Sequence, residues 1–540
     1  MNAWRTNLLR SAGVLALLAC FLVGVVAVEA WRARHDDPLV QPEYVSLMAE
    51  VVERPADQAL RERLRTVDRE LRTLHVERAE RLRRGAWAIA VLGGLAVLAV
   101  AIARLGRIEP YDPRGQPPPD PWRGAAAPRL GVLGAAVMIA GGWSLLGRSA
   151  PTALPAVVVA PASAADFARN WPCFRGPRGD GSTATPWPAT PRERWRVPAG
   201  LPGTSSPIVW DGGIYLTGGD AQRQTVTAFD AATGAQRWQT SVPFPPGAKP
   251  EPFEDTGYAA PTPVTDGRQV VAVFASGALV ALDCLDGKTR WQKQLGVPTS
   301  MYSFAASLAI WQDRVLLQWD VDDEGKSALT AFGTATGREL WRTRRELPAA
   351  WSSPILARLG GREVVLCAGN PRLAAYDPAN GAELWHADLF HGDVGPSPIV
   401  VGDRAIFANA RNLVAALQPD GSTAWKSEDG LPDTVSPVSD GTQVALISDG
   451  GMLTAFAVAD GAKAWEQDLS GSFKASPLVH GSDLLLFGAD GQGRRVTLGA
   501  SCTLGEPWSA GGAVAASPAV VDGRLYVRTA EHLVCYEAAP

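Results

Sequence analysis

The sequence predicts an all-β fold, an eight-bladed β-propeller with four-stranded blades, preceded by an α-helical membrane region. A short pattern that begins with Ala and ends with Trp recurs through the last two thirds of the chain. Gly (55 residues) and Trp (19 residues) are abundant, as expected for many short strands joined by turns. The first third instead contains long uncharged apolar runs.

The repeat predicts one hairpin per blade. An alternating strand leads into a turn whose Gly can adopt a positive φ, and a second strand then places its Trp inward. The clearest copies are AFDAATGAQRW (228–238), ALDCLDGKTRW (281–291), AFGTATGRELW (331–341) and AYDPANGAELW (375–385). Weaker copies are AALQPDGSTAW (415–425) and AFAVADGAKAW (455–465).

A second pair of strands precedes each hairpin. It opens with a Ser-Pro or Thr-Pro pair, as at Ser206, Thr262 and Ser353, because Pro is tolerated at the first residue of a strand. Each unit therefore has four strands. The closing tryptophans, which we interpret as packing between blades, predict eight blades: Trp195, Trp238, Trp291, Trp341, Trp385, Trp425, Trp465 and Trp508.

The two ends of the repeat region are complementary. Residues 192–197 form an outer strand with no hairpin before it, whereas residues 516–537 supply only three strands. We therefore expect the N-terminal strand to complete the last blade, which leaves no open sheet edge.

Three apolar runs predict membrane spans at about 12–28, 86–103 and 130–146. Arg5 and Arg10 precede the first run, and further arginines surround the connection between the second and third runs. This distribution places the N-terminus and that connection on the cytoplasmic side. Three spans would then deliver the propeller to the other face. A cleavable signal is the alternative interpretation of the first run.

These patterns divide the chain into a membrane region at 1–147, a Pro- and Ala-rich linker at 148–168 and a propeller at 169–540. The membrane region includes a charged helical segment at 45–84, whose apolar stripe could pack on its own neighbours or form a dimer.

Composition and motifs exclude several classes of function. With 51 basic and 55 acidic residues, the chain gives no electrostatic case for binding nucleic acid. The six cysteines include no C-x-x-C motif, although a disulfide involving Cys173 or Cys502 is left open. The acidic turn 320–325 lacks the last acid of a calcium loop, because Ala331 stands there. We interpret it as a solvated hairpin tip, and we predict no metal site and no catalytic residue.

The pattern Ala-x-Asp-x-x-x-Gly-x-x-x-Trp resembles the tryptophan-docking repeat of pyrroloquinoline-quinone (PQQ) dehydrogenases and their relatives. The segment NWPCFRGP at 170–177 is similar to the lead-in of PQQ-like repeat proteins of bacterial envelopes. This family includes dehydrogenases and non-enzymatic propellers, among them the lipoprotein of the outer-membrane β-barrel assembly machinery. The dehydrogenases typically have a vicinal disulfide over the quinone, and this chain has no adjacent cysteines. We therefore predict no cofactor.

Long loops at the propeller mouth are the candidate binding surface, although loops that only cap their own blades are an equal alternative. Aromatic and acidic residues in these loops suit protein or peptide recognition: Glu254, Asp255, Tyr258, Tyr302, Trp351, His391, Asp393, Asp433 and Phe473.

The leading hypothesis is a non-catalytic scaffold for envelope proteins, anchored in the bacterial inner membrane as a multi-pass protein with its propeller in the periplasm. The alternatives are a PQQ-dependent alcohol or sugar dehydrogenase and a membrane-tethered ligand sensor.

Overall fold

The computed structural model describes residues 3–35, single positions and short stretches between 47 and 102, and residues 162–247, 250–410 and 412–539. The chain divides into two compact units, Met1–Ala160 and Pro161–Pro540. Helix α1 (Ala3–His35) belongs to the first unit.

The predicted three-span membrane region is wrong. Within the described part of the chain, no helix combines the length and the apolar character that crossing a membrane requires. The run 12–28 lies between Arg10 and Glu29 in α1 and is shorter than the ~20 residues that a span needs. The run 86–103 is described only in part, and the run 130–146 lies outside the described residues, as does most of the segment 45–84.

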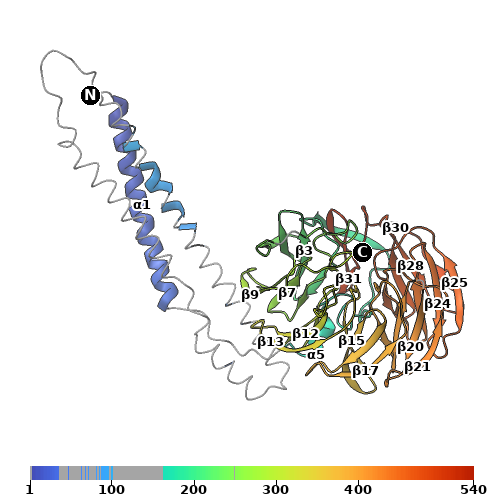
Figure 1. The fold of residues 1–540 in the computed structure, drawn as a ribbon. Helices are drawn as coiled ribbons and strands as arrows, with labels where there is room; N and C mark the ends of the chain where they lie inside the picture. The colour runs from blue at the N-terminus through green and yellow to red at the C-terminus, as the bar shows by residue number, and fades with distance from the viewer. Residues whose placement is uncertain are drawn as a thin grey trace, which may run out of the picture. The chain divides into compact units, whose positions relative to one another are not determined.

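The second unit is an eight-bladed propeller, as predicted. Figure 1 shows its blades placed side by side around the ring. Blade 1 contains β2 (Ile208–Trp210), β3 (Gly213–Gly219), β4 (Gln224–Asp230) and β5 (Gln236–Val242). Blade 2 contains β6 (Val264–Thr265), β7 (Gln269–Val273), β8 (Ala278–Asp283) and β9 (Thr289–Gln294). Blade 3 contains β10 (Ala309–Trp311), β11 (Arg314–Trp319), β12 (Ala328–Gly333) and β13 (Glu339–Arg344).

The next three blades repeat this order. Blade 4 contains β14 (Ile355–Leu359), β15 (Arg362–Ala368), β16 (Arg372–Tyr376) and β17 (Glu383–Asp388). Blade 5 contains β18 (Ile399–Val401), β19 (Arg404–Asn409), β20 (Leu413–Leu417) and β21 (Thr423–Ser427). Blade 6 contains β22 (Val438–Ser439), β23 (Gln443–Ile447), β24 (Met452–Ala457) and β25 (Lys463–Asp468).

The last two blades depart from this order. Blade 7 contains β26 (Leu478–His480), β27 (Asp483–Phe487) and β28 (Gln492–Thr497), with a split outer strand formed by β29 (Thr503–Leu504) and β30 (Trp508–Ser509). Blade 8 contains β31 (Ala519–Val521), β32 (Arg524–Arg528) and β33 (His532–Ala538), and β1 (Pro191–Pro198) is its outer strand.

The N-terminal strand closes the ring, which confirms the prediction. Strand β1 pairs antiparallel with β33, with Trp195 opposite Cys535. Arg192 and Arg194 each form a 2.5 Å ion pair with Glu537. The first and last parts of the propeller are therefore joined in one sheet.

Most of the repeated tryptophans contact the next blade. Trp291 of blade 2 donates a 2.6 Å hydrogen bond from Nε1 to the carbonyl oxygen of Thr334 in blade 3. A Cβ atom on Gly337 would lie 2.6 Å from the Trp291 ring. The same indole N–H to carbonyl bond is made by Trp195, Trp238, Trp341, Trp425 and Trp465. Trp385 packs on Gly421, and Trp508 packs on Phe487 and Tyr536.

A series of hydroxyl groups joins the inner edges of successive blades from blade 1 to blade 8. In each link, the backbone N–H of one Ser or Thr donates to the side-chain oxygen of the next blade, at 2.9–3.1 Å. The links run in order through Ser206, Thr262, Ser307, Ser353, Ser397, Ser436, Ser476 and Ser517. All eight residues are buried. We call this series the hydroxyl girdle.

Replacing Ser353 with alanine should lower the free energy of unfolding by about 1–3 kcal/mol, because the buried N–H of Ser307 would lose its acceptor. The matched control is Ser352→Ala, since the buried Ser352 hydroxyl has no hydrogen-bond partner among the described residues. Urea unfolding measures both variants. Equal losses in the two variants would contradict the role of the girdle.

Residues 170–183 lie across the central channel. Trp171 exchanges two 2.8 Å backbone hydrogen bonds with Val209 of blade 1, and Val479 of blade 7 donates to the Gly181 carbonyl. The buried Arg175 donates to the Pro437 carbonyl beside blade 6. A short helix, α5 (Ala164–Arg169), precedes this segment and is capped by Ser163. Because Asn170 Oδ1 accepts from the backbone N–H of Asp211, which follows β2, the segment occupies the channel end opposite Ser206, which precedes β2.

Candidate interaction site

The mouth of the propeller is formed by two kinds of connection in each blade. Strands in a blade are antiparallel and adjacent, so the turn between the second and third strands lies at the same end as the connection from the fourth strand to the next blade. We call these connections the mouth loops. The connection from β5 to β6, residues 243–263, is the longest.

Three successive mouth loops are joined by aromatic contacts. The rings of Phe253 and Tyr302 have centroids 5.1 Å apart, and those of Tyr302 and Trp351 are 4.8 Å apart, both edge-to-face. Trp351 donates from Nε1 to the Ser303 carbonyl at 2.8 Å. We call Phe253, Tyr302 and Trp351 the aromatic cluster. Its geometry is typical of favourable aromatic pairs, so these loops form a fixed surface.

Polar contacts extend the aromatic cluster to a fourth mouth loop. The Tyr302 hydroxyl donates to Asp393 Oδ2 at 3.2 Å, and the Trp351 backbone N–H donates to the Val394 carbonyl at 2.9 Å. Phe253 remains 44% exposed and the neighbouring Met301 is 73% exposed. An apolar surface is therefore held open to solvent at the rim.

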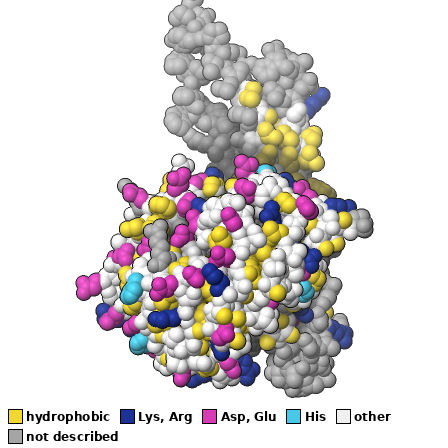
Figure 2. Space-filling view, turned by 90° about the vertical axis from the view of Figure 1, so that its right-hand side faces the viewer, with side chains coloured by type: hydrophobic (Ala, Val, Ile, Leu, Met, Phe, Trp, Pro, Cys, Tyr) yellow, Lys and Arg dark blue, Asp and Glu magenta, His cyan; other side chains and the backbone are white. Residues whose placement is uncertain are grey.

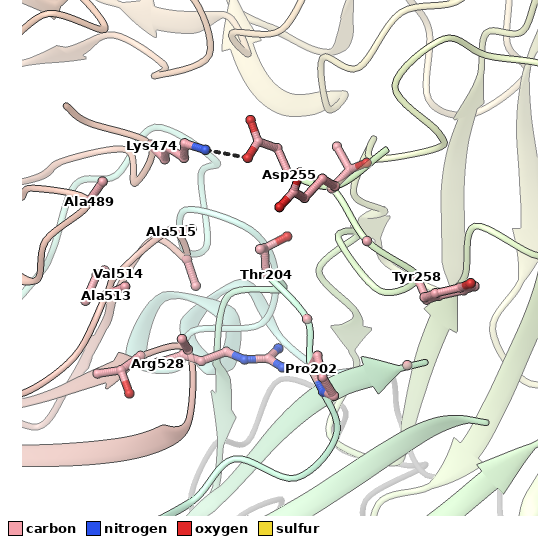
Figure 3. A pocket seen from close by; sticks show the side chains of 18 of the residues that line it. Pro202, Thr204, Asp255, Tyr258, Lys474, Ala489, Ala513, Val514, Ala515 and Arg528 are labelled. Atoms are coloured by element: carbon pink, nitrogen blue, oxygen red, sulfur yellow. Dashed lines mark hydrogen bonds and ion pairs between the residues drawn. The ribbon is translucent and has the colours of Figure 1, made fainter. Parts of the chain in front are cut away.

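A pocket of about 490 Å³ lies under residues 254–258 of the longest mouth loop. Figure 3 shows Lys474 and Asp255 above it, Ala513–Ala515 on one side and Arg528 below. Lys474 Nζ and Asp255 Oδ1 are 2.7 Å apart. This ion pair joins the connection between blades 1 and 2 to that between blades 6 and 7. Small side chains line much of the wall, including Ala489, Val514, Ala516 and Ala530.

Arg528 at the floor is a buried cation held by backbone carbonyls. Its Nη1 donates to the carbonyl oxygens of Ser205 and Thr217, at 3.1 and 2.8 Å, and Nη2 donates to that of Leu201 at 3.3 Å. Burial lowers the pKa of this guanidinium to about 10. Because the contacts tie blade 8 to blade 1, we assign Arg528 a structural role in the pocket floor.

Acidic side chains outnumber basic ones in the described mouth loops. The basic residues with exposed charge each pair with an acid. Arg223 Nη2 lies 3.4 Å from Asp220 Oδ2, and Lys326 Nζ lies 3.1 Å from Asp323 Oδ1. Lys474 Nζ lies 2.7 Å from Asp255 Oδ1. The described part of the mouth therefore carries a net negative charge. Its other exposed or partly exposed acids are Glu251, Glu254, Asp322, Glu324, Glu346, Asp393, Glu428, Asp429, Asp433, Asp449, Asp490 and Glu531.

The structure separates the sequence-predicted surface residues into groups. Tyr302, Trp351 and Asp393 come together at the rim, while Glu254, Asp255 and Tyr258 line the pocket. His391 and Asp433 are exposed elsewhere on the mouth. Phe473 is only 7% exposed and packs in the core with Val435 and Val479, so it does not belong to the surface.

Two features were not found from the sequence. Phe253 is not among the predicted surface residues, although its loop supplies Glu254, Asp255 and Tyr258 and an aromatic residue there is a usable signal. Asp320, interpreted as part of a solvated tip, has a fully buried side chain and pairs with Arg345 at 2.9 Å. Among the described residues, no group of three or more His, Cys, Asp or Glu is placed to hold a metal ion, and the six cysteines are unpaired.

Comparison with known proteins places this architecture in a family. A family model described as "Outer membrane protein assembly factor BamB" matches residues 179–317, 325–436 and 410–498, more than half of the chain. The chain belongs to the BamB family. The resemblance to a PQQ-like propeller related to that assembly factor is therefore confirmed.

Two curated BamB proteins are similar to parts of the chain. BamB of Alkalilimnicola ehrlichii is 26% identical over 197 residues, which cover 36% of this chain and 50% of the relative. BamB of Burkholderia pseudomallei is 27% identical over 258 residues, which cover 46% of this chain and 62% of the relative. The chain thus spans between half and two thirds of these BamB relatives.

Solved structures share the fold at low sequence identity. BamB from Moraxella catarrhalis aligns with a TM-score of 0.50 at 20% identity, covering 65% of this chain and 98% of that one. The quinohemoprotein alcohol dehydrogenase from Comamonas testosteroni aligns with a TM-score of 0.54 at 14% identity, covering 70% and 82%. These likenesses to BamB and to a dehydrogenase concern the propeller fold alone.

The comparisons also correct the predicted location. The curated relatives are named as factors in outer membrane protein assembly, and the described residues include no helix suited to crossing a membrane. The prediction of a multi-pass protein of the bacterial inner membrane is therefore wrong.

Proposed function

We propose that this BamB-family propeller is a non-catalytic scaffold that holds a protein partner at its mouth during outer-membrane protein assembly. The observation that carries the proposal is the aromatic cluster, in which Phe253, Tyr302 and Trp351 from three loops form a fixed apolar surface beside a pocket. Exposed aromatic residues on a rigid scaffold suit protein recognition.

The family supports the kind of partner, because the relatives are named as outer membrane protein assembly factors. The position of residues 170–183 supports the mouth as the face that binds the partner. Residues 170–183 occupy the opposite end, where Trp171 pairs with Val209, whereas the pocket beside the longest mouth loop lies at the mouth. The proposed function requires no cofactor.

A photo-crosslinking residue in place of Met301 tests the proposal in cells that produce the full chain. We expect crosslinking to a defined envelope protein, because Met301 is 73% exposed beside the aromatic cluster. The matched control replaces Leu504, which is 38% exposed on the outer strand of blade 7. The absence of an adduct at Met301, or the same adduct at Leu504, would contradict the proposal. Saturable PQQ binding with dye reduction by the purified chain would contradict its non-catalytic part.

A further inference from the structure

We infer that the mouth selects a basic protein segment that carries an aromatic or long apolar side chain. This inference rests on the proposed function and specifies the chemistry of the partner. Three features carry it: acids around the aromatic cluster that form no ion pair with another described residue, exposed apolar side chains beside them, and a buried cation at the floor of the pocket below.

Three acids in the mouth loops around the aromatic cluster form no ion pair with another described residue. Glu254 follows Phe253 directly, and Asp393 accepts from the Tyr302 hydroxyl. Glu324 lies in the turn after β11, which contacts the loop containing Tyr302 through a 2.8 Å backbone hydrogen bond from Asp322 to Thr299. None of Glu254, Glu324 and Asp393 forms an ion pair with another described residue, so a basic partner would find uncompensated charge there. We call these three acids the acidic rim.

The apolar side chains beside the acidic rim provide an anchor. Phe253 and Met301 keep 44% and 73% of their surface exposed, and burial of such surface on binding is favourable by ~25 cal/mol per Å². Arg or Lys side chains also gain from contact with the faces of Trp and Tyr rings. An aromatic surface bordered by carboxylates therefore fits a segment in which basic and large apolar side chains are close together.

The pocket below the acidic rim limits where basic side chains can bind. Its cations are Lys474, already paired with Asp255, and Arg528 at the floor. Because Asp255 neutralises Lys474 and the pocket is also lined by Asp220 and Glu254, the repulsion comes from Arg528 and acts on a basic side chain that reaches the floor. The small residues of its wall, such as Ala513 and Ala515, allow close approach of a polypeptide backbone. We therefore place the basic side chains of the bound segment on the rim.

The flank of the propeller around β24 and β25 carries side chains of both charge signs (Figure 2). From the side on which β24 and β25 lie, acidic and basic side chains are interspersed over the surface (Figure 2). Two exposed acids on outer strands or their connections, Glu339 of β13 and Glu506 of blade 7, therefore serve as controls that change net charge away from the mouth.

The test uses the full chain and a fluorescent peptide rich in Lys, Arg and Phe. Saturable binding should weaken about tenfold when Glu254→Gln, Glu324→Gln and Asp393→Asn are combined. The combined control, Glu339→Gln and Glu506→Gln, should leave binding unchanged. A matched peptide with Glu in place of its basic residues should not bind, and one with Ala in place of Phe should bind several-fold more weakly.

Two results would overturn the inference: equal binding of the basic and acidic peptides, or equal losses in the rim and control variants. The crosslinking at Met301 separates this failure from failure of the proposed function. An adduct whose crosslinked segment is acidic would leave the scaffold in place and refute the inference. The absence of any adduct would refute the proposed function itself.

Discussion

Replacing Asp320 with alanine is expected to lower the free energy of unfolding by about 3–5 kcal/mol, because it leaves the buried Arg345 without its counter-ion. Both side chains have no exposed surface, and Arg345 Nε lies 2.9 Å from Asp320 Oδ1. Gln318 donates to the other carboxylate oxygen at 2.7 Å, and Arg345 Nη1 donates to the Tyr376 hydroxyl at 2.8 Å. The network links blades 3 and 4. Urea unfolding followed by tryptophan fluorescence measures the loss.

The contacts between the two charged groups favour an ionised pair, although burial raises the pKa of the Asp320 carboxyl above its ordinary value. Although burial lowers the pKa of Arg345, the attraction of Asp320 raises it above its ordinary value. The matched control is Glu324→Ala in the same turn, which should change stability by less than about 0.5 kcal/mol because this side chain is exposed. A double replacement, Asp320→Leu with Arg345→Met, should recover much of the loss, since apolar residues can replace buried ion pairs. A loss in Asp320→Ala no larger than that in Glu324→Ala would contradict the assigned role.

The ring itself could be predicted because its signals are local. Each copy of the repeat contains a strand, a Gly turn and a Trp within a short stretch. The hairpin it predicts therefore does not depend on distant residues. Closure by β1 followed from counting strands at the two ends, and the pairing of Trp195 with Cys535 confirms it. The apolar run 12–28 did indicate a helix, but the composition of a helix does not by itself establish a membrane span.

The contacts between blades could not be predicted in the same way. Asp320 and Arg345 lie at the ends of β11 and β13, and an acidic turn usually faces water. The hydroxyl girdle was hidden because its Ser-Pro pairs were interpreted through Pro alone, and Ser307 is not followed by Pro. Both features depend on neighbouring blades, so they emerge only when the ring is assembled.

The candidate site likewise combines residues that the sequence predicts with contacts that only the structure reveals. The sequence identified Tyr302, Trp351 and Asp393 as mouth residues, because loop position follows from the repeat. It could not show that Phe253 completes the aromatic cluster, since that contact joins two loops. It also could not separate Phe473 from the surface, because burial in the core of blades 6 and 7 is decided by packing.

Replacing Gly337 with alanine is expected to lower the free energy of unfolding by about 2–4 kcal/mol. Gly337 has a φ of +64°, which costs an L-residue roughly 1–2 kcal/mol. Its new Cβ would also lie 2.6 Å from the Trp291 ring, and such overpacking typically costs about 1–3 kcal/mol. Urea unfolding measures the sum of these two effects.

Two comparisons separate backbone strain from the clash with Trp291. Gly402 has a φ of +57°, but a Cβ atom added to it would meet no described atom within 4 Å, so Gly402→Ala should show the backbone cost alone, roughly 1–2 kcal/mol. In a Trp291→Ala background, the added cost of Gly337→Ala should fall to that of Gly402→Ala, because the ring is gone. If the cost of Gly337→Ala were the same with and without Trp291, the indole would not be what requires glycine there. The expected coupling between Gly337→Ala and Trp291→Ala would instead establish what the Ala-to-Trp repeat specifies. It specifies one contact, in which the indole of one blade packs on the glycine turn of the next.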